Sequence, residues 1–477
     1  MTVFVVQSTG NNVANLPPLL ELASPEDPIL WLESDRAELS AWSDGALEVL
    51  ARRGLGRLQT VRAGTRLDEL SQALRTAIRG QLESGSQQRI CLVGNGGTKL
   101  QIMAAWETLK QEVRDPGDLE LVYGLDRPAA LQRLPSGPTG EVRETLYGSH
   151  QESSGAATIS LTEVLECRGF ELGPGGNAVR LWPGGQPPFP DLQGYGTDSS
   201  RTAARHDAFV DESPSGEPLP RHRVPAYDRV REHARFDAWT STVFGLLRRV
   251  DSVLLESTKQ GTPRPSGAQR AALIRVLQGA QDQGSSLYHA TMNLAVEASS
   301  PSDGRRRPRS PIGPVFESAV VRRLLDWIDR DEQTASRAVS EVHLGVEVKQ
   351  RGAGTVFAEL DVLLVLRNGV LLHLECKSHV APQKDLDARV STLRSAGSDL
   401  AVLAVVAPLY TDFADRSWTT TSAELIERIR QQGGRIHAVA FTLPDQPDSY
   451  VDPTGASHQV PSFEQSLDAL LRPYVPS

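Results

Sequence analysis

Three residues in the last third of the sequence have the types and the spacing of a metal-dependent hydrolytic site. Asp361 is followed, after thirteen residues, by Glu375 and then, two positions on, by Lys377. Carboxylate oxygens are the ligands that Mg²⁺ and Mn²⁺ prefer, and a bound divalent cation lowers the pKa of a coordinated water. A lysine near that water can stabilise or orient the hydroxide. Hydrolysis of a phosphodiester bond is the natural use of such a group.

Two strands must position these residues, and the sequence predicts both. The runs 357–366 and 370–377 are strongly apolar, and Asn368-Gly369 between them is a strong hairpin signal. Side chains of a strand alternate between its faces, so Glu375 and Lys377 share a face, and hairpin pairing brings the acid of the first strand beside them. Acids are costly to bury among aliphatic residues unless they are paired or bind a cation. This setting favours a functional site over a solvated strand end.

We expect Asp361 and Glu375 to bind the cation through their carboxylates, with the backbone carbonyl of Cys376 as a third ligand. Zinc is disfavoured because no cluster of histidines and cysteines accompanies the acids, and the three cysteines of the chain are scattered. The strand position of His373 would allow it near the metal, but we interpret it as a core or rim histidine.

The N-terminal part of the sequence alternates strand-like and helix-like segments. The predicted strands are 3–7, 29–33, 58–62, 90–93 and 119–123, and the predicted helices are 16–22, 47–53, 67–82 and 99–110. This alternation predicts an α/β fold, with a mostly parallel sheet covered by helices on both sides. In such sheets, ligands bind at the carboxyl ends of the strands.

Polar loops follow two of these predicted strands. The first loop, 7–15, follows the strand 3–7 and is rich in small polar donors. The second loop, 94–99, joins a strand to a helix. Its glycines let a ligand approach the backbone, and free N–H groups at a helix start bind anions. It has neither Walker A nor G-x-G-x-x-G spacing, which disfavours ATP hydrolysis and NAD binding. A tight turn with a good helix cap explains the same residues equally well. The candidate ligand-binding residues are Ser8, Thr9, Asn12, Asn95, Gly96, Gly97, Thr98 and Lys99.

Bulk properties limit the remaining possibilities. The chain has 477 residues, is 39% hydrophobic and 23% charged, and carries a net charge of −9, as expected for a globular protein of more than one domain. No apolar run is long enough to cross a bilayer, and the first residues read as a strand, so we expect a cytoplasmic protein without a membrane partner. We expect three parts, 1–150, 151–312 and 313–477. The middle one is a Pro/Gly-rich and helical insertion, with helices predicted at 226–258 and 267–297 and a basic linker at Arg305–Arg309.

The C-terminal part resembles the PD-(D/E)xK nuclease superfamily, in which a helix, a hairpin with the aspartate, the E-x-K strand and a second helix follow one another. The resemblance implies a restriction-endonuclease-like domain that cleaves DNA and/or RNA with Mg²⁺ or Mn²⁺. Asp361, Glu375 and Lys377 would be its catalytic residues. The resemblance also implies that Glu317, on the leading helix, takes part in catalysis by binding the metal, and that Arg389 is a basic residue of the site.

The loop Asn95-Gly-Gly-Thr-Lys99 resembles the signature of the CARF domain, a Rossmann-like sensor of CRISPR-associated proteins, and the segment 159–170 resembles the connection that follows it. CARF domains bind cyclic oligoadenylates across a homodimer axis, and cyclic tetra-adenylate is the activator we expect first. The order of the two domains resembles that of the cyclic-oligoadenylate-activated CRISPR ancillary nucleases of type III antiviral defence. A constitutive restriction- or repair-type endonuclease and a non-enzymatic nucleotide sensor remain as alternatives.

Overall fold

The computed structural model describes residues 1–82, 89–136, 142–146, 158–173, 179–182, 312–331, 333–377, 383–409, 426, 428–429, 436–442, 449–451 and 457–475. The helices predicted at 226–258 and 267–297 and the basic linker Arg305–Arg309 lie outside these residues. Within them, no helix combines the length and the hydrophobicity needed to cross a membrane.

The N-terminal unit is built on a seven-stranded sheet in the order β3-β2-β1-β4-β5-β6-β7. Its strands are β1 (Thr2–Gln7), β2 (Ile29–Glu33), β3 (Leu58–Arg62), β4 (Arg89–Val93), β5 (Leu119–Leu125), β6 (Ala130–Pro135) and β7 (Arg143–Leu146). The first five strands are parallel, which confirms the prediction, whereas β6 and β7 are antiparallel additions that the sequence analysis missed. The winding reverses between β1 and β4, so the loops after these two strands leave the same edge side by side.

Helices cover both faces of this sheet. They are α1 (Leu16–Leu22), α2 (Asp35–Leu39), α3 (Asp44–Arg52), α4 (Leu67–Leu82) and α5 (Lys99–Glu112), with short 3-10 turns η1 (Asn12–Asn15) and η2 (Pro116–Asp118). Leu70, Leu74 and Ile78 recur every four residues and form the buried stripe of α4 against one face of β1. Residues of α1 and α3 pack against the opposite face of the same strand.

The C-terminal unit is built on a second mixed sheet in the order β14-β13-β12-β11-β10-β8, with β9 also paired to β10. Its strands are β8 (Phe170–Leu172), β9 (Val179–Trp182), β10 (Val339–Gln350), β11 (Ala358–Leu366), β12 (Leu371–Cys376), β13 (Val402–Pro408) and β14 (Ile436–Phe441), and β15 (Ser449–Val451) pairs with β16 (Ser457–Gln459) separately. The remaining elements are α12 (Ile312–Arg330), α13 (Ala335–Ala338), α14 (Gln383–Ala396), α16 (Phe463–Leu471) and η5 (Arg472–Tyr474). The predicted hairpin joins β11 to β12, and Gly369 in its turn has a φ of +80°.

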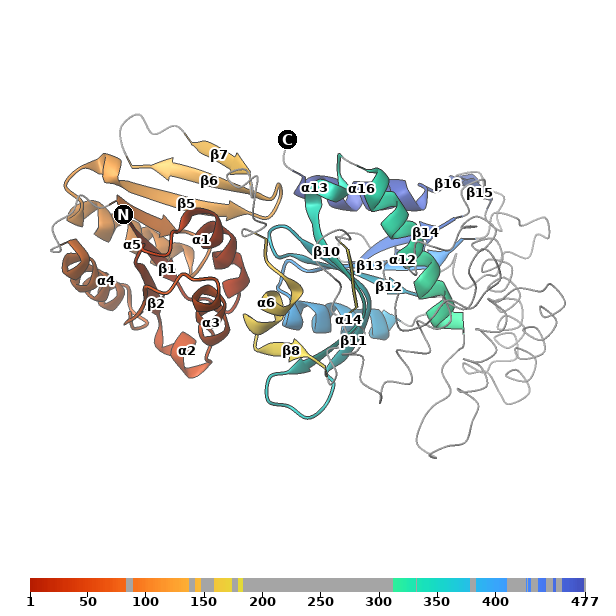
Figure 1. Cartoon of the computed structure of the whole chain (residues 1–477), viewed down its shortest axis with the longest axis horizontal. Helices are drawn as coiled ribbons and strands as arrows, with labels where there is room; N and C mark the ends of the chain where they lie inside the picture. The colour runs from red at the N-terminus through yellow and green to blue at the C-terminus, as the bar shows by residue number, and fades with distance from the viewer. Residues whose placement is uncertain are drawn as a thin grey trace.

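The helices of this unit lie on opposite faces of its sheet (Figure 1). Phe441 of β14 makes edge-on ring contacts with Phe316 of α12 and Phe463 of α16, which places both helices on one face. Leu386 and Leu393 bury α14 on the other face. The acid-bearing strands β11 and β12 therefore lie in the middle of a covered sheet.

A short helix, α6 (Leu161–Glu166), lies between the two units (Figure 1). Arg53 of the first unit forms an ion pair with Glu163 at 2.6 Å, and the N–H of Leu161 donates to Glu341 of β10 at 2.9 Å. One apolar cluster runs from the α1/α3 face of the first sheet through α6 into the second sheet. The two units are thus joined by apolar packing as well as by the chain.

Candidate active site

The pairing between strands β11 and β12 ends next to the two predicted acids, Asp361 and Glu375. Their ladder ends at Val362 and Leu374, and the next pair in register, Asp361 and Glu375, is not formed although both residues lie within their strands. Each strand remains paired along its other edge, β11 with β10 and β12 with β13. The two acids therefore face each other where the centre of the sheet is open.

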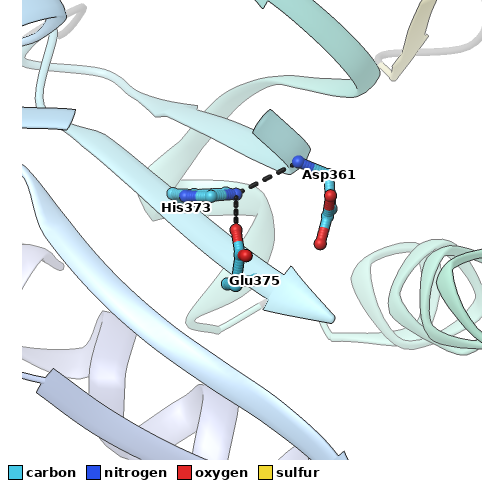
Figure 2. Close-up of side chains that lie close together, drawn as sticks. All are labelled: Asp361, His373 and Glu375. Atoms are coloured by element: carbon cyan, nitrogen blue, oxygen red, sulfur yellow. Dashed lines mark hydrogen bonds and ion pairs between the residues drawn. The ribbon is translucent and has the colours of Figure 1, made fainter. Parts of the chain in front are cut away.

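Asp361, His373 and Glu375 come together at this opening. One possible ligand atom from each lies within 4.8 Å of the others. Figure 2 shows the imidazole of His373 between the backbone nitrogen of Asp361 and the carboxylate of Glu375. The Asp361 N–H donates to His373 Nε2 at 3.1 Å, and the same ring nitrogen lies 3.3 Å from Glu375 Oε2.

Two cations hold Glu375. Lys377 Nζ forms an ion pair with Glu375 Oε1, and Arg389 Nε lies 3.2 Å from the same oxygen. Arg389 Nη1 also donates to the carbonyl oxygen of Glu359 at 2.9 Å, which ties α14 to β11. The Glu375 side chain is fully buried, whereas 26% of the Lys377 side chain is exposed, so the amine connects the buried carboxylate with the surface.

The surroundings shift the pKa values of the two acids in opposite directions. Burial, and then the charges of Glu317 and Glu375, raise the pKa of Asp361 well above its usual range. Burial also raises the pKa of Glu375, but the neighbouring basic groups outweigh it and the net pKa is lowered. Burial lowers the pKa of His373 to about 4, so near neutral pH the positive charge beside Glu375 comes from the lysine and the arginine. While no cation is bound, Asp361 therefore holds its proton more strongly than Glu375 does.

The donor atoms fit a hard divalent cation. Asp361 Oδ2 accepts the N–H of Cys376 at 2.8 Å, which orients that carboxylate. Neither oxygen of Glu375 accepts a hydrogen bond of normal geometry within the described part of the chain. Glu317 is buried and close enough for its charge to act on Asp361 and Cys376. Burial raises the pKa of the Cys376 thiol, which stays neutral, so the backbone carbonyl is the donor that this residue offers to Mg²⁺ or Mn²⁺.

His373 is the residue of this cluster that the sequence analysis undervalued. The imidazole is fully buried, as a core histidine would be, but it lies among the acids. The signal was its place two residues before Glu375, which puts both side chains on one face of β12. The sequence could not show that the pairing of β11 with β12 stops just before Asp361 and Glu375.

The two polar loops of the N-terminal unit meet beside the end of β1. A Cβ on Gly96 would lie 1.8 Å from the carbonyl oxygen of Gln7 and 2.9 Å from Asn15 Nδ2. Gly97 has a φ of +75°, the left-handed conformation that favours glycine, and a Cβ there would lie 2.3 Å from Gln7 Oε1. Both glycines are thus required by the contact between the loops.

Three of the predicted ligand residues, Ser8, Asn12 and Asn95, use their side chains inside the protein. The Ser8 hydroxyl is buried and lies 2.8 Å from Ser43 Oγ. Asn12 is fully buried and donates to Ser8 Oγ at 3.3 Å and to the carbonyl of Trp42 at 2.7 Å. Asn95 Nδ2 donates to the Gly124 carbonyl at 2.7 Å, and Asn95 Oδ1 accepts the Gly124 N–H at 2.7 Å. These side chains shape the loops rather than line their surface.

Few of the candidate ligand-binding residues of the two loops face solvent. Gly97, Thr98 and Lys99 are exposed and Thr9 is half-buried, and the Thr98 hydroxyl caps α5 by accepting the N–H of Gln101. Below them Gln7 Oε1 and Asn15 Oδ1 are buried without a hydrogen-bond partner in the described residues. Both amides belong to the predicted polar loop 7–15, but neither is among the candidate ligand-binding residues named from the sequence. Gln7 carried a signal, because it is a polar residue that ends an otherwise apolar strand.

No family model matches the chain, and no curated protein matches it. Among solved structures, protein VC1899 from Vibrio cholerae aligns with a TM-score of 0.52 and 14% identity over 92% of this chain and 94% of that chain. Can2 from Sulfobacillus thermosulfidooxidans, solved with cyclic tetra-adenylate, aligns with a TM-score of 0.46 and 14% identity over 92% of this chain and 95% of that one.

A type III CRISPR defence DNA nuclease activated by cyclic oligoadenylate aligns with a TM-score of 0.39 and 15% identity over 85% of this chain and 45% of that one. The first alignment shows that both units and their order belong to a fold shared with VC1899. The other two are too weak to carry an argument about this chain.

Proposed function

We propose that this protein is a metal-dependent endonuclease, activated by a cyclic oligoadenylate, that cleaves DNA and/or RNA in type III CRISPR defence. The observation that carries the catalytic half is the cluster at the opening between β11 and β12. Asp361 and Glu375 present carboxylates within 4.8 Å of each other, and Lys377 lies against Glu375. This is the arrangement that the resemblance to PD-(D/E)xK nucleases requires of these residues.

Each residue has a definite part in the proposed reaction. Asp361, Glu375 and Glu317 hold Mg²⁺ or Mn²⁺ with the Cys376 carbonyl. A bound cation of this kind would acidify a water and offset charge on the phosphate. Lys377, which lies at the border between the buried carboxylate and solvent, orients the attacking water and stabilises its ionised form.

The second half of the proposal concerns the loops after β1 and β4. They meet where the winding of the sheet reverses, which is where sheets of this order bind ligands. The exposed Lys99 offers a cation for phosphate. Gln7 Oε1 and Asn15 Oδ1 are buried beneath the second loop, and a movement of this loop would make them acceptors for the amino groups of a nucleobase. These features support a CARF-type sensor for a cyclic oligoadenylate, with cyclic tetra-adenylate as the first candidate.

Activation requires a contact between the sensor loops and the catalytic unit, and Arg168 supplies one. Its Nη1 donates to the carbonyl of Gly10 in the first loop. Its Nε and Nη2 donate to the carbonyls of Ser395 and Arg394 at 3.2 and 3.3 Å, in the last turn of α14. The same helix carries Arg389, which touches Glu375. A loop that moves on ligand binding would therefore pull on the helix that holds the catalytic glutamate.

A homodimer is part of the proposal, because a cyclic ligand shared between two sensor units would couple two catalytic units. Leu100 and Met103, one turn apart at the start of α5, are 63% and 62% exposed beside the second loop. An apolar pair of this kind next to the loops supports self-association at the sensor face.

The decisive experiment compares the wild-type protein with Asp361→Ala and Lys377→Ala. Each is incubated with single- and double-stranded DNA and RNA, with Mg²⁺, Mn²⁺ or EDTA, and with or without cyclic tri-, tetra- and hexa-adenylate. We expect cleavage only with both a divalent cation and one cyclic oligoadenylate, and loss of cleavage in both variants.

Other outcomes separate the alternatives. Equal cleavage with and without activator would identify a constitutive endonuclease. Binding of a cyclic oligoadenylate without cleavage and without Mn²⁺ binding in calorimetry would identify a sensor without enzymatic activity. Wild-type cleavage by either variant would remove the assignment of the catalytic residues.

A further inference from the structure

Asp361 is paired in neither of the ladders that flank its strand. On the β12 side, the ladder ends at Val362. On the β10 side, the register passes from Val362 to Leu360 and skips Asp361, whose facing residue is Gly345. Gly345 has a φ of +63°, a conformation that takes its peptide out of the extended ladder. The backbone N–H of the proposed metal ligand therefore needs an acceptor from elsewhere.

The imidazole of His373 provides that acceptor. Its Nε2 lies 3.1 Å from the Asp361 nitrogen and accepts the N–H, which assigns the ring proton of the neutral imidazole to Nδ1. In this tautomer the 3.3 Å approach of Nε2 to Glu375 Oε2 is a contact and not a hydrogen bond. Nδ1 is buried and meets no acceptor in the described residues. A buried donor without a partner is costly, and an aliphatic residue at this fully buried position would avoid the cost. The role that explains an imidazole at this position is to accept the backbone N–H of Asp361 in β11.

A second bond crosses the same opening from the other strand. The N–H of Cys376 in β12 donates to Asp361 Oδ2 at 2.8 Å. In both of these bonds a side chain accepts a backbone N–H of the other strand: His373 accepts that of Asp361, and Asp361 accepts that of Cys376. They replace the ladder pair that is missing between Asp361 and Glu375. They hold the strands together while keeping the centre of the sheet open for a ligand.

We propose that His373 is a positioning residue for the metal site: it fixes the backbone of Asp361 and does not itself bind the cation. This inference rests on the proposed function. A neutral imidazole has one lone pair, and at Nε2 that lone pair is directed at the Asp361 N–H. The donors left for the metal are oxygens, so the site has no nitrogen ligand with which to prefer Mn²⁺ over Mg²⁺.

The test measures binding of Mn²⁺ and Mg²⁺ by calorimetry for the wild type, His373→Leu and His373→Gln. The glutamine keeps an amide oxygen at about the reach of Nε2, whereas leucine removes the acceptor. We expect His373→Leu to weaken both metals by a similar factor of about 10–100 and His373→Gln to recover most of the loss. His343→Leu, which removes another buried histidine of the same sheet, is the matched control and should bind both metals as the wild type does.

Hydrogen exchange of the metal-free proteins gives an independent readout. We expect faster exchange of the peptide 358–366 in His373→Leu than in the wild type or in His343→Leu. A much larger loss of Mn²⁺ than of Mg²⁺ affinity, without rescue by glutamine, would show that His373 is a ligand and overturn the proposal. Unchanged exchange in β11 would overturn it as well. If the wild type binds neither metal, the proposed function fails, while the exchange comparison still decides whether His373 holds Asp361.

Discussion

Replacing Gly96 by alanine tests whether the two N-terminal loops are packed as the structure indicates. The added Cβ would lie 1.8 Å from the Gln7 carbonyl oxygen, although real Cβ contacts do not fall below 3.0 Å, so the loop and β1 must separate by about 1.2 Å. The obstacle is backbone of a central strand, paired on both sides, and it cannot swing aside as a side chain would. Overpacking of this kind costs roughly 1–3 kcal/mol.

The stability measurement is thermal and denaturant unfolding of Gly96→Ala beside Gly80→Ala. Gly80 lies on the exposed side of α4, and a Cβ there meets nothing within 4 Å, so alanine should stabilise the helix by about 0.5–1 kcal/mol. We expect the melting temperature of Gly96→Ala to fall by roughly 2–4 °C for each kcal/mol lost. A Gly96→Ala protein as stable as the wild type would refute the packing of the loops.

The binding measurement separates packing from function. We expect Gly96→Ala to bind cyclic tetra-adenylate at least about tenfold more weakly, because the loop must move by more than an ångström, and to bind Mn²⁺ normally. Unchanged nucleotide affinity in a destabilised variant would mean that the loops are tightly packed but are not the sensor site.

Four further predictions concern the catalytic unit and its connection to the sensor. Lys377→Met should cut more slowly by about 10²–10⁴-fold in single-turnover assays, with Mn²⁺ affinity retained or increased because a competing cation is gone. Because the pKa of Asp361 is raised by burial and by Glu317, Mn²⁺ affinity should increase with pH, and calorimetry in buffers of different ionisation enthalpy should detect a released proton. Burial raises the pKa of Glu163, but the hydrogen bonds from Arg53 and Ser160 outweigh burial and lower it overall. The ionised Glu163 therefore stabilises the folded protein at neutral pH, and this contribution is lost as the pH falls through the folded-state pKa. Glu163→Gln should lower the free energy of unfolding by about 1–3 kcal/mol at pH 7, measured by denaturant unfolding, and by less in acid. Arg168→Lys, which cannot span three carbonyls, should keep the affinity for the activator but lower the activator-dependent cleavage rate at least about fivefold. An unchanged rate would exclude Arg168 as the connection.

The strands and helices were predictable where one local signal was strong. The hairpin at Asn368-Gly369 follows from its turn residues, and the helix stripe of Leu70, Leu74 and Ile78 follows from its period. β6 and β7 were missed because they contain polar and charged residues, and the pairing of β6 with β5 and of β7 with β6 is visible only in three dimensions.

The candidate site was predictable in its residue types but not in its geometry. The alternation of β12 places Glu375 and Lys377 on one face, and the hairpin brings Asp361 beside them. The ladder between β11 and β12 ends before Asp361 and Glu375, and on the other edge of β11 the facing residue is Gly345 of a third strand, so no local pattern could reveal how Asp361 is held. For the same reason the sequence indicated Asn12 and Asn95 as ligand donors, whereas their amides are engaged with distant backbone groups.

If the proposed function holds, the charges that surround Asp361 would let a phosphodiester bind at this site only after a cation has bound. Three carboxyls, on Glu317, Asp361 and Glu375, face two cations, Lys377 and Arg389. Because the carboxyls outnumber the cations, the metal-free site has no excess positive charge with which to attract a phosphate. Entry of a divalent cation and loss of the Asp361 proton leave one positive charge in excess, which matches the single negative charge of a phosphodiester. Metal binding would thus create the affinity for the nucleic acid as well as the means to cleave it.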